Sequence, residues 1–355
     1  MSLEALLQRG VDEQVYPLYR LEAFHQGRHL LSLGNTAPGC VFDLASVTKV
    51  MSTTALALDL GLPLDAPLNR FVPKAVANAT IGDLLFHRSG LPAFLPYFEH
   101  ELLSHPELYD GLQRAEVRRH VLERVAATAQ LAAVGAQSVY SDLGFILLGA
   151  ALEALENTPL DQLFTERIAR PLGLSAAYRR LSAGLPIPAT FAPTGKTRPR
   201  EPAPSQEGMW NVPERATQPA EVDDDNAWVL DGVSGHAGLF GTALDVAQFG
   251  QGILDQRWTP PVPWGRDSTP GSTRALGFDT PSAEGASCGQ RFGTKGPRGA
   301  IGHLGFTGTS LWIDLDRQLV VSFLTNRVAL GRANIRIRAF RPQVHDAVLD
   351  ALKLE

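Results

Sequence analysis

Ser46 and Lys49 form a Ser-x-x-Lys pattern that could support nucleophilic chemistry. A serine hydroxyl is a poor nucleophile until a neighbour accepts its proton, and a lysine accepts one only when burial and nearby cations lower its pKa. A spacing of three residues at the start of a helix places both side chains on one face, where the helix dipole favours a developing alkoxide. In the alternative interpretation, Ser46 caps the helix and Lys49 is a solvated cation. The pattern is unique in this chain, because the other lysines follow, at that spacing, Phe71, Pro193, Phe292 and Asp350.

Two further segments carry side chains that would complete such a site. Tyr140 begins the segment YSD, ahead of the apolar helical run LGFILLG, and His303 lies in GHLG, ahead of the strand-like run TGTSLWID. A phenol, an ammonium and an imidazole are groups that move protons in hydrolases. Taken singly, Tyr140 is typical of a core aromatic and His303 of a turn, but as an ordered set with Ser46 they predict a catalytic site.

The three segments together resemble the serine β-lactamase and penicillin-binding protein superfamily, and most of all its class C β-lactamase, esterase and D-aminopeptidase branch. In that family the first motif is Ser-x-x-Lys, the second Tyr-x-Asn and the third usually Lys-Thr-Gly. Here Tyr140 and Asp142 fill the second motif with a carboxylate in place of the amide, and the third reads His303-Leu304-Gly305. The likeness extends to the segments FDLASVTKVMSTTALALDLG, TIGDLLFHRSGLP, YSDLGFILLG and GHAGLFGTALDVAQF.

The resemblance implies a mechanism through a covalent acyl-enzyme on Ser46. Tyr140, its pKa lowered by Lys49 and with His303 as a further candidate for that effect, accepts the serine proton and returns it to the leaving group. Water then repeats the sequence to release the acyl group. The backbone N–H groups of Ser46 and of Phe306, which follows the third motif on the edge strand, are expected to hold the oxyanion.

The departures from the family pattern bear on the substrate. His303 is mostly neutral near pH 7, so it should weaken the preference for a substrate carboxylate that the family's lysine helps to bind. Asp142 could pair with Lys49 and hold it charged, which would leave Tyr140 as the proton acceptor. We expect Asp142, Gly305 and His236 to contribute to substrate binding, although His236 is also typical of an ordinary turn.

Periodicity and turn residues predict the elements that must position these side chains. Gln26-Gly27 between two short apolar runs predicts a hairpin, and Asp316-Arg317 separates two strand-like runs near the end of the chain. The helical pattern that begins at Ser46 predicts a helix to Leu60 that stops at Gly61. The other expected elements are a short helix over 80–90 capped by Thr80 with Asp83 at its third position, mainly helices over 65–172, an irregular surface excursion over about 181–226, and a closing helix over 333–355.

Strands at both ends of the chain around a helical middle argue against a parallel βαβ series. By resemblance we expect an α/β fold of the α+β type, β-lactamase/transpeptidase-like, with an antiparallel sheet assembled from both chain ends and flanked by helices. A mainly helical domain is inserted between the ends. The predicted boundaries are 1–64 and 232–355 for the α/β domain and 65–231 for the helical domain with its long irregular loop region, with the active site in the cleft between them.

Composition places the chain among ordinary globular proteins, with 355 residues, 44% hydrophobic and 19% charged. A net charge of -5, with no like-charged block beyond 223–225, gives no footprint for nucleic acid. Cys40 and Cys288 are expected as small buried residues rather than a disulfide scaffold. The first ten residues lack the pattern of a signal peptide and no apolar run approaches about 20 residues, so we expect no membrane segment and a cytoplasmic location, with a removed leader as the alternative.

Other patterns predict little. The segment PTGKT around Lys196 lacks the first Walker glycine, because Thr190 stands in its place, and no Gly-x-Ser-x-Gly elbow occurs. His236 near Asp223, Asp224 and Asp225 is not accompanied by a helical His-x-x-x-His or by clustered cysteines, as metal sites are. We therefore expect neither a cofactor nor a metal.

The leading hypothesis is a serine hydrolase of the β-lactamase family that cleaves ester or amide bonds. Short acyl esters, D-amino-acid peptides and β-lactams are the candidate small-molecule substrates. The alternative is a penicillin-recognising receptor that acylates at Ser46 without efficient turnover. A peptide-binding scaffold with no covalent step is disfavoured, because nucleophile, base and lysine are all retained.

Overall fold

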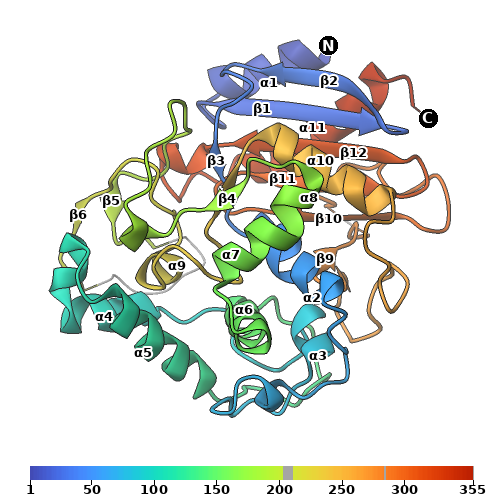
Figure 1. Ribbon diagram of the computed structural model, residues 1–355. Helices are drawn as coiled ribbons and strands as arrows, with labels where there is room; N and C mark the ends of the chain where they lie inside the picture. Colours follow the sequence, from blue (N-terminus) through green and yellow to red (C-terminus); the bar gives the residue numbers. More distant parts are fainter. Residues whose placement is uncertain (203–210, 284, 355) are drawn as a thin grey trace.

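The principal sheet of the protein is assembled from both ends of the chain. The computed structural model describes residues 1–202, 211–283 and 285–354. Within it seven antiparallel strands follow the order β2-β1-β12-β11-β10-β9-β8 (Figure 1). β1 pairs with β12 from Tyr19 opposite Thr325 to His25 opposite Leu319, which joins the two ends. The strands are β1 (Tyr19–His25), β2 (Arg28–Gly34), β8 (Arg274–Ala275), β9 (Phe278–Asp279), β10 (Ala300–Leu304), β11 (Ser310–Asp314) and β12 (Leu319–Thr325).

Both predicted strand pairs are confirmed. Gln26 and Gly27 adopt φ angles of 49° and 74°, so the loop between β1 and β2 is a two-residue turn with both residues left-handed, as hairpins favour. The turn between β11 and β12 contains Asp316 and Arg317. The predicted antiparallel sheet is therefore present.

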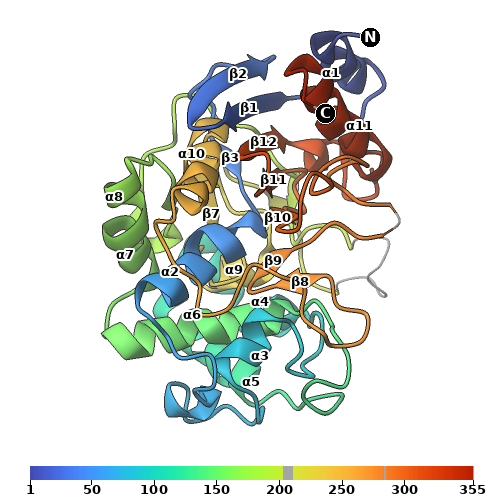
Figure 2. The same ribbon diagram turned by 90° about the vertical axis from the view of Figure 1, so that its right-hand side faces the viewer.

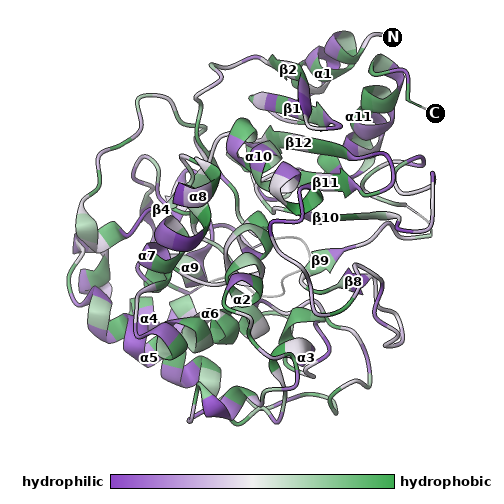
Figure 3. Cartoon of the chain, turned by 45° about the vertical axis from the view of Figure 1, so that its right-hand side comes forward, coloured by the Kyte–Doolittle hydropathy of each residue, from purple (hydrophilic) through white to green (hydrophobic). Residues whose placement is uncertain are grey.

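Helices cover the sheet on both faces, and the alternation of side chains along β12 shows why. Val321 and Phe323 join the cluster formed with α1 (Leu3–Asp12) and α11 (Ile337–Ala351). Val320 and Leu324 belong to the larger core that includes α10 (Ala243–Leu254). Figure 2 shows α1 and α11 on one side of the sheet and α10 on the other, and Figure 3 shows the hydrophobic colour of β11 and β12 between them.

The remaining helices lie in the middle of the chain, below the sheet in Figure 1. In the described part of the chain, two segments have the wider π-helical turn, Lys49–Thr54 (η1) and Thr165–Ala169 (η4). Two small sheets among the same residues, β3-β7-β4 and β5-β6, lie outside the principal one. The other elements are α2 (Ala55–Asp59), α3 (Ile81–Leu85), α4 (Tyr97–Ser104), α5 (Arg114–Ala126), α6 (Asp142–Glu156), α7 (Leu160–Phe164), α8 (Arg170–Leu172), α9 (Asp225–Val229), β3 (Phe42–Asp43), β4 (Ala177–Tyr178), β5 (Thr197–Arg198), β6 (Arg215–Ala216), β7 (Leu239–Gly241) and the 3-10 helices Leu68–Arg70, Pro106–Asp110, Leu181–Ala183 and Arg327–Leu330.

Two helix predictions need correction. The helix expected from Ser46 to Leu60 contains the π-helical η1 before α2, since apolar spacing does not distinguish turns that differ by one residue in their hydrogen bonds. The short helix expected over 80–90 ends at Leu85, because His87 adopts a left-handed φ of 55°. Its predicted start is confirmed, with Thr80 and Asp83 forming a capping box.

Three further predictions bear on the rest of the chain. Cys40 and Cys288 are buried and free, as expected. The irregular stretch expected over about 181–226 contains only short elements where it is described, and its residues 203–210 lie outside the described part. The domain boundaries and the cytoplasmic location stay predictions. Over the described ranges, no single helix has the length and apolar content to cross a membrane, and only the bent pair Asp142–Glu156 and Leu160–Leu172 meets both criteria together.

Candidate active site

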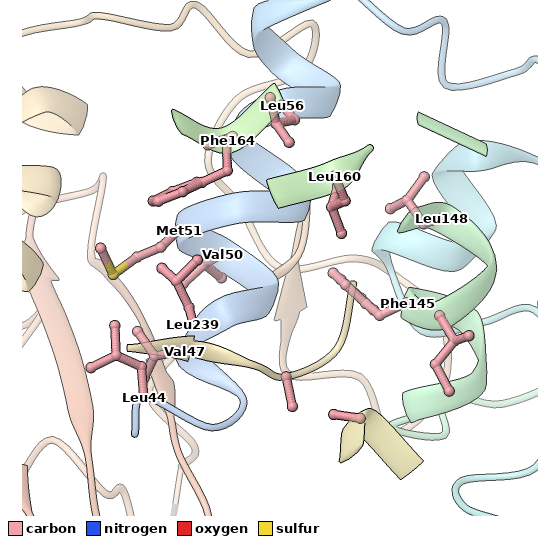
Figure 4. Close-up of a cluster of buried hydrophobic side chains, with 14 of the residues drawn as sticks. Leu44, Val47, Val50, Met51, Leu56, Phe145, Leu148, Leu160, Phe164 and Leu239 are labelled. Carbon is pink, nitrogen blue, oxygen red and sulfur yellow. The ribbon is translucent and has the colours of Figure 1, made fainter. Parts of the chain in front are cut away.

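Ser46 lies on a sharp turn between β3 and the helical segment that follows it. Ala45 adopts a left-handed φ of 47°, and its N–H donates to Asp43 Oδ1 at 2.8 Å, which holds the turn. Such a backbone conformation costs a residue with a Cβ on the order of 1 kcal/mol, so the surrounding packing must impose it. Val47, Val50 and Met51 are completely buried next to Leu44 and Leu239, as Figure 4 shows, and they anchor the segment.

Lys49 makes the contacts that define the site. Its ammonium donates to Ser46 Oγ at 3.0 Å and to the carbonyl oxygen of His236 at 3.2 Å. It lies 2.7 Å from Asp142 Oδ1, and its side chain is 0% exposed. The Lys49 ammonium lies 4.7 Å from the centroid of the Tyr140 ring, and the Tyr140 hydroxyl interacts with both Lys49 and Ser46. The fold therefore brings the first two motifs together around one hydroxyl.

The charges of this group agree with the sequence-based expectation for Lys49, which pairs with Asp142, and differ from it for Tyr140. Burial lowers the pKa of Lys49, but the Asp142 carboxylate and Tyr140 outweigh it, and the net pKa is raised above 10.5. Burial raises the pKa of Tyr140 above 10.0, Asp142 raises it further, and Lys49 only partly opposes them. The predicted lowering of the Tyr140 pKa is therefore wrong, because desolvation of the phenolate exceeds its attraction to the ammonium. At rest the site holds an ammonium and a neutral phenol.

His303 lies on β10 beside Tyr140, with 5.8 Å between ring centroids. Its Nδ1–H donates to the Leu304 carbonyl oxygen at 2.8 Å, which leaves the lone pair on Nε2. Burial, followed by the nearby cations Lys49 and Arg274, holds the His303 pKa well below 6.5. His303 is therefore neutral and adds no positive charge to lower the pKa of Tyr140.

Two residues that the sequence analysis did not select also contact Tyr140. The His87 ring lies 4.7 Å from the Tyr140 ring, and its Nδ1 accepts a hydrogen bond from the Ser141 N–H at 3.0 Å. The Arg274 guanidinium lies over the Tyr140 ring, 4.9 Å from the ring centroid. His87 lies in the segment TIGDLLFHRSGLP, whose pattern predicts a helix but not a site residue, and no motif marks Arg274.

Comparison with known proteins agrees with this arrangement. The sequence model of the protein family described as Beta-lactamase matches residues 4–343. The chain belongs to this family. The resemblance inferred from the three motifs is thereby confirmed, and the β-lactamase-family chain is a serine hydrolase.

Similar proteins span several hydrolase types. An N-acetylmuramyl-L-alanine amidase of Bacillus subtilis (strain 168) is 30% identical over 323 residues, covering 81% of this chain and 68% of the amidase. A putative D-alanyl-D-alanine carboxypeptidase of Escherichia coli (strain K12) is 29% identical over 322 residues, covering 81% of this chain and 69% of that protein. The solved structure of a class C β-lactamase from Rhodobacter sphaeroides superposes with a TM-score of 0.62 at 19% identity, covering 99% of each chain. The β-lactamase/transpeptidase-like fold is confirmed.

The third motif of this β-lactamase-family hydrolase packs directly against the turn that carries the nucleophile. A Cβ on Gly305 would lie 2.0 Å from Thr309 Oγ1 and 2.5 Å from the Leu44 carbonyl oxygen, so only glycine fits there. Thr309 Oγ1 donates to that same carbonyl at 3.0 Å, and Thr307 Oγ1 donates to the Asp43 carbonyl at 2.8 Å. Strand β10 and the Ser46 turn are thus fixed to each other.

The predicted oxyanion donors lie at this junction. Among the described residues, neither the Ser46 N–H nor the Phe306 N–H donates to another group, and both residues line the cleft. Contrary to the expectation, Phe306 does not lie on an edge strand. Strand β10 ends at Leu304, and it is not an edge strand because β9 pairs with it through Gly302 and Asp279. Phe306 belongs instead to the turn between β10 and β11.

His236 is placed differently from the expectation that it lines the cleft. Its side chain is 1% exposed, with Nε2 at 2.9 Å from Asp224 Oδ1 and Nδ1 at 2.8 Å from Ser234 Oγ. Asp224 lines the cleft in front of it. His236 therefore reaches the site through its backbone carbonyl, which accepts from Lys49, and through Asp224. The neighbouring carboxylates of Asp223 and Asp225 are occupied by arginines, namely Arg198, Arg200 and Arg332.

The cleft in front of Ser46 encloses about 350 Å³. Its lining combines aromatic side chains, Phe94, Phe98 and Phe306, with Asp224 and a group of arginines from the C-terminal segment. A cavity of this size with few convergent polar groups is typical of small-molecule sites. Phe98 and Phe306 both line this cleft together with Ser46.

Proposed function

We propose that Ser46 is the nucleophile of an acyl-enzyme mechanism on ester or amide substrates. The observation that carries this proposal is the contact of Ser46 Oγ with Lys49 Nζ at 3.0 Å and with the Tyr140 hydroxyl, at an open cleft. Since the ammonium and the phenol are both protonated at rest, the pair must lose one proton before it can act as a base. The phenolate form is then paired with the Lys49 ammonium.

In this state the Tyr140 phenolate can accept one proton and later return it. Tyr140 accepts the proton of Ser46 while Oγ bonds to the carbonyl carbon, and the carbonyl electrons move to the oxygen held by the N–H groups of Ser46 and Phe306. Tyr140 then gives the proton to the leaving oxygen or nitrogen, and the acyl group stays on Ser46. Water repeats both transfers and releases the acid.

We further propose that peptides and amides that carry a free carboxylate are preferred substrates. The names of the two curated relatives support amide-bond cleavage in amino-acid compounds. Arg338 and Arg341 line the cleft, and neither has a carboxylate partner among the described residues. Burial, together with Arg327, lowers the pKa of Arg341 to about 9, so a bound anion would stabilise its charge. These cations supply the charge that neutral His303 does not.

A labelling experiment tests the nucleophile. Mass spectrometry after exposure to a fluorophosphonate should show one adduct on Ser46 in the wild-type chain and none in Ser46→Ala. A turnover panel of p-nitrophenyl esters, D-alanyl amides and a chromogenic cephalosporin then separates a hydrolase from a receptor, since a receptor would acylate without release. An unlabelled Ser46 would reject both.

The charge preference has its own test. Arg338→Gln should raise KM for a D-alanyl amide that ends in a carboxylate by about 5- to 10-fold and leave KM for its carboxamide analogue unchanged. Arg28→Gln, which removes an exposed arginine from β2, is the matched control. Equal KM changes for both analogues would contradict the preference.

A further inference from the structure

A histidine and carboxylate cluster lies between α4 and α5, on elements that the catalytic mechanism does not use. Glu101 on α4 and His105 at its end are four residues apart, and His120 comes from α5, which packs against α4 (Figure 1). One donor atom from each of these three side chains lies within 4.8 Å of the others. Two imidazoles and a carboxylate are a ligand set that zinc takes in proteins.

The Glu101 carboxylate is the unusual member. It is 0% exposed, and its Oε2 has no hydrogen-bond partner among the described residues. His120 Nδ1 lies 3.9 Å from this oxygen. That separation is too long for a hydrogen bond and exceeds by about 0.6 Å the roughly 3.3 Å between two donors on a tetrahedral zinc ion. A buried carboxylate oxygen without a donor is costly, and a cation between these atoms would satisfy it.

A second carboxylate, that of Glu107, faces one ring nitrogen of His105. Its Nδ1 lies 3.3 Å from Glu107 Oε1, and since a carboxylate only accepts, Nδ1 carries the hydrogen and Nε2 the lone pair. A carboxylate on the far nitrogen of a metal-binding histidine is the usual supporting contact. The His120 side chain is 46% exposed, which leaves a route for the ion and for a water ligand.

Other charged groups face the same carboxylate. Arg124 Nη1 donates to Glu101 Oε1 at 2.9 Å, and His100 Nδ1 lies 3.2 Å from that oxygen. Both contacts involve Oε1, whereas the oxygen without a hydrogen-bond partner is Oε2. Arg124 therefore opposes a cation electrostatically without occupying its position.

We propose that Glu101, His105 and His120 bind one Zn²⁺ that fastens α4 to α5. The donor atoms lie within 4.8 Å of one another and must approach by up to about 1.5 Å, since bonds of about 2.0–2.1 Å in a tetrahedron place donors roughly 3.3 Å apart. The ion would act on the cleft indirectly. Phe98, one helical turn before Glu101, lines the cleft, and its N–H donates to Asn226 Oδ1 of α9 at 3.1 Å. Zinc would thus stiffen the helical wall opposite Phe306.

Zinc titration of untagged, chelator-treated protein tests the site. We expect one ion per chain by calorimetry, a rise in thermal midpoint with added ZnCl₂, and slower amide hydrogen exchange confined to residues 97–126. His120→Gln, a change at a largely exposed side chain, should weaken zinc binding by at least about 10-fold. His25→Gln, on β1, is the control and should bind zinc as the wild type does.

Two results would overturn the proposal. One is equal zinc affinity in His120→Gln and the wild type, and the other is zinc binding without any change in exchange at α4 and α5. The site is independent of catalysis, so Ser46→Ala should bind zinc unchanged. A failure of zinc binding would therefore leave the acyl-enzyme proposal intact.

Discussion

The ammonium of Lys49 lies 2.7 Å from Asp142 Oδ1, closer than its 3.0 Å to Ser46 Oγ. The carboxylate raises the pKa of Lys49 against the effect of burial, and it also raises the pKa of Tyr140. The amide that the family usually has at this position would carry no such charge. This ion pair makes the chain's proton chemistry differ from that expected of its motifs.

The first prediction concerns the pH profile of the wild-type enzyme. Since Lys49 and Tyr140 keep their protons beyond their ordinary pKa values of 10.5 and 10.0, the active base is the minor form at neutral pH. We expect kcat/KM to rise about tenfold per pH unit between about pH 7 and 9. His87 and His303, with pKa values well below 6.5, should add no step near pH 6.5. A plateau that begins below about pH 8 in the profile would contradict this charge assignment.

The second prediction concerns Asp142→Asn. Removing the carboxylate takes away a cause that raises the pKa of both Lys49 and Tyr140, so the rising limb should move to lower pH by about one unit. At pH 7 this corresponds to a gain in kcat/KM of up to about tenfold. Asp65→Asn changes the net charge equally at an exposed position and should leave the limb in place. The pH profiles of kcat/KM for the two variants test this prediction. A rising limb that moves to higher pH in Asp142→Asn would refute it.

The third prediction concerns the phenol. Tyr140→Phe removes the proposed proton acceptor and should lower kcat by about 10²- to 10⁴-fold, with the fold retained. Tyr97→Phe removes a hydroxyl that contacts Thr128 on the helical side, so it should keep wild-type kcat and lose only about 1 kcal/mol of unfolding free energy. Steady-state kinetics and urea unfolding measure both. Near-normal turnover in Tyr140→Phe would return the role of base to Lys49.

The fourth prediction concerns packing behind Lys49. A Cβ on Gly235 would lie 2.1 Å from the Phe145 carbonyl oxygen, and the Gly235 carbonyl accepts from Thr53 Oγ1 at 2.6 Å. Gly235→Ala should therefore cost about 2–3 kcal/mol in unfolding free energy and shift the adjacent His236 carbonyl that holds Lys49.

Gly39 offers a matched control for that substitution. A Cβ there meets nothing within 4 Å, so Gly39→Ala should leave stability almost unchanged. Urea unfolding of the two variants gives the comparison. Equal stability of Gly235→Ala and Gly39→Ala would show that the segment relaxes at no cost.

Local features of the sequence predicted local structure well. The two-residue turn at Gln26 and Gly27 and the capping box of Thr80 and Asp83 depend on residues next to each other in the chain, so the printed sequence contains all that is needed. The end of α3 could not be predicted, because His87 adopts a left-handed φ although it is not a glycine or asparagine, the residues that usually mark such a position. Packing against Tyr140 and Phe145 accompanies that conformation.

The sequence by itself determined the family, the order of the motifs and the proximity of Ser46 to Lys49, because a spacing of three on a helical turn places two side chains together wherever the helix lies. Only the tertiary structure decided the charges of the site. A pKa depends on burial and on every charge within a few ångströms, and the groups that set it for Tyr140 arrive from separate elements, Lys49 from η1 and Asp142 from α6. The Glu101 cluster is likewise a product of folding, since its members meet only when α4 packs against α5, and the arginines of α11 face Ser46 only in the folded chain.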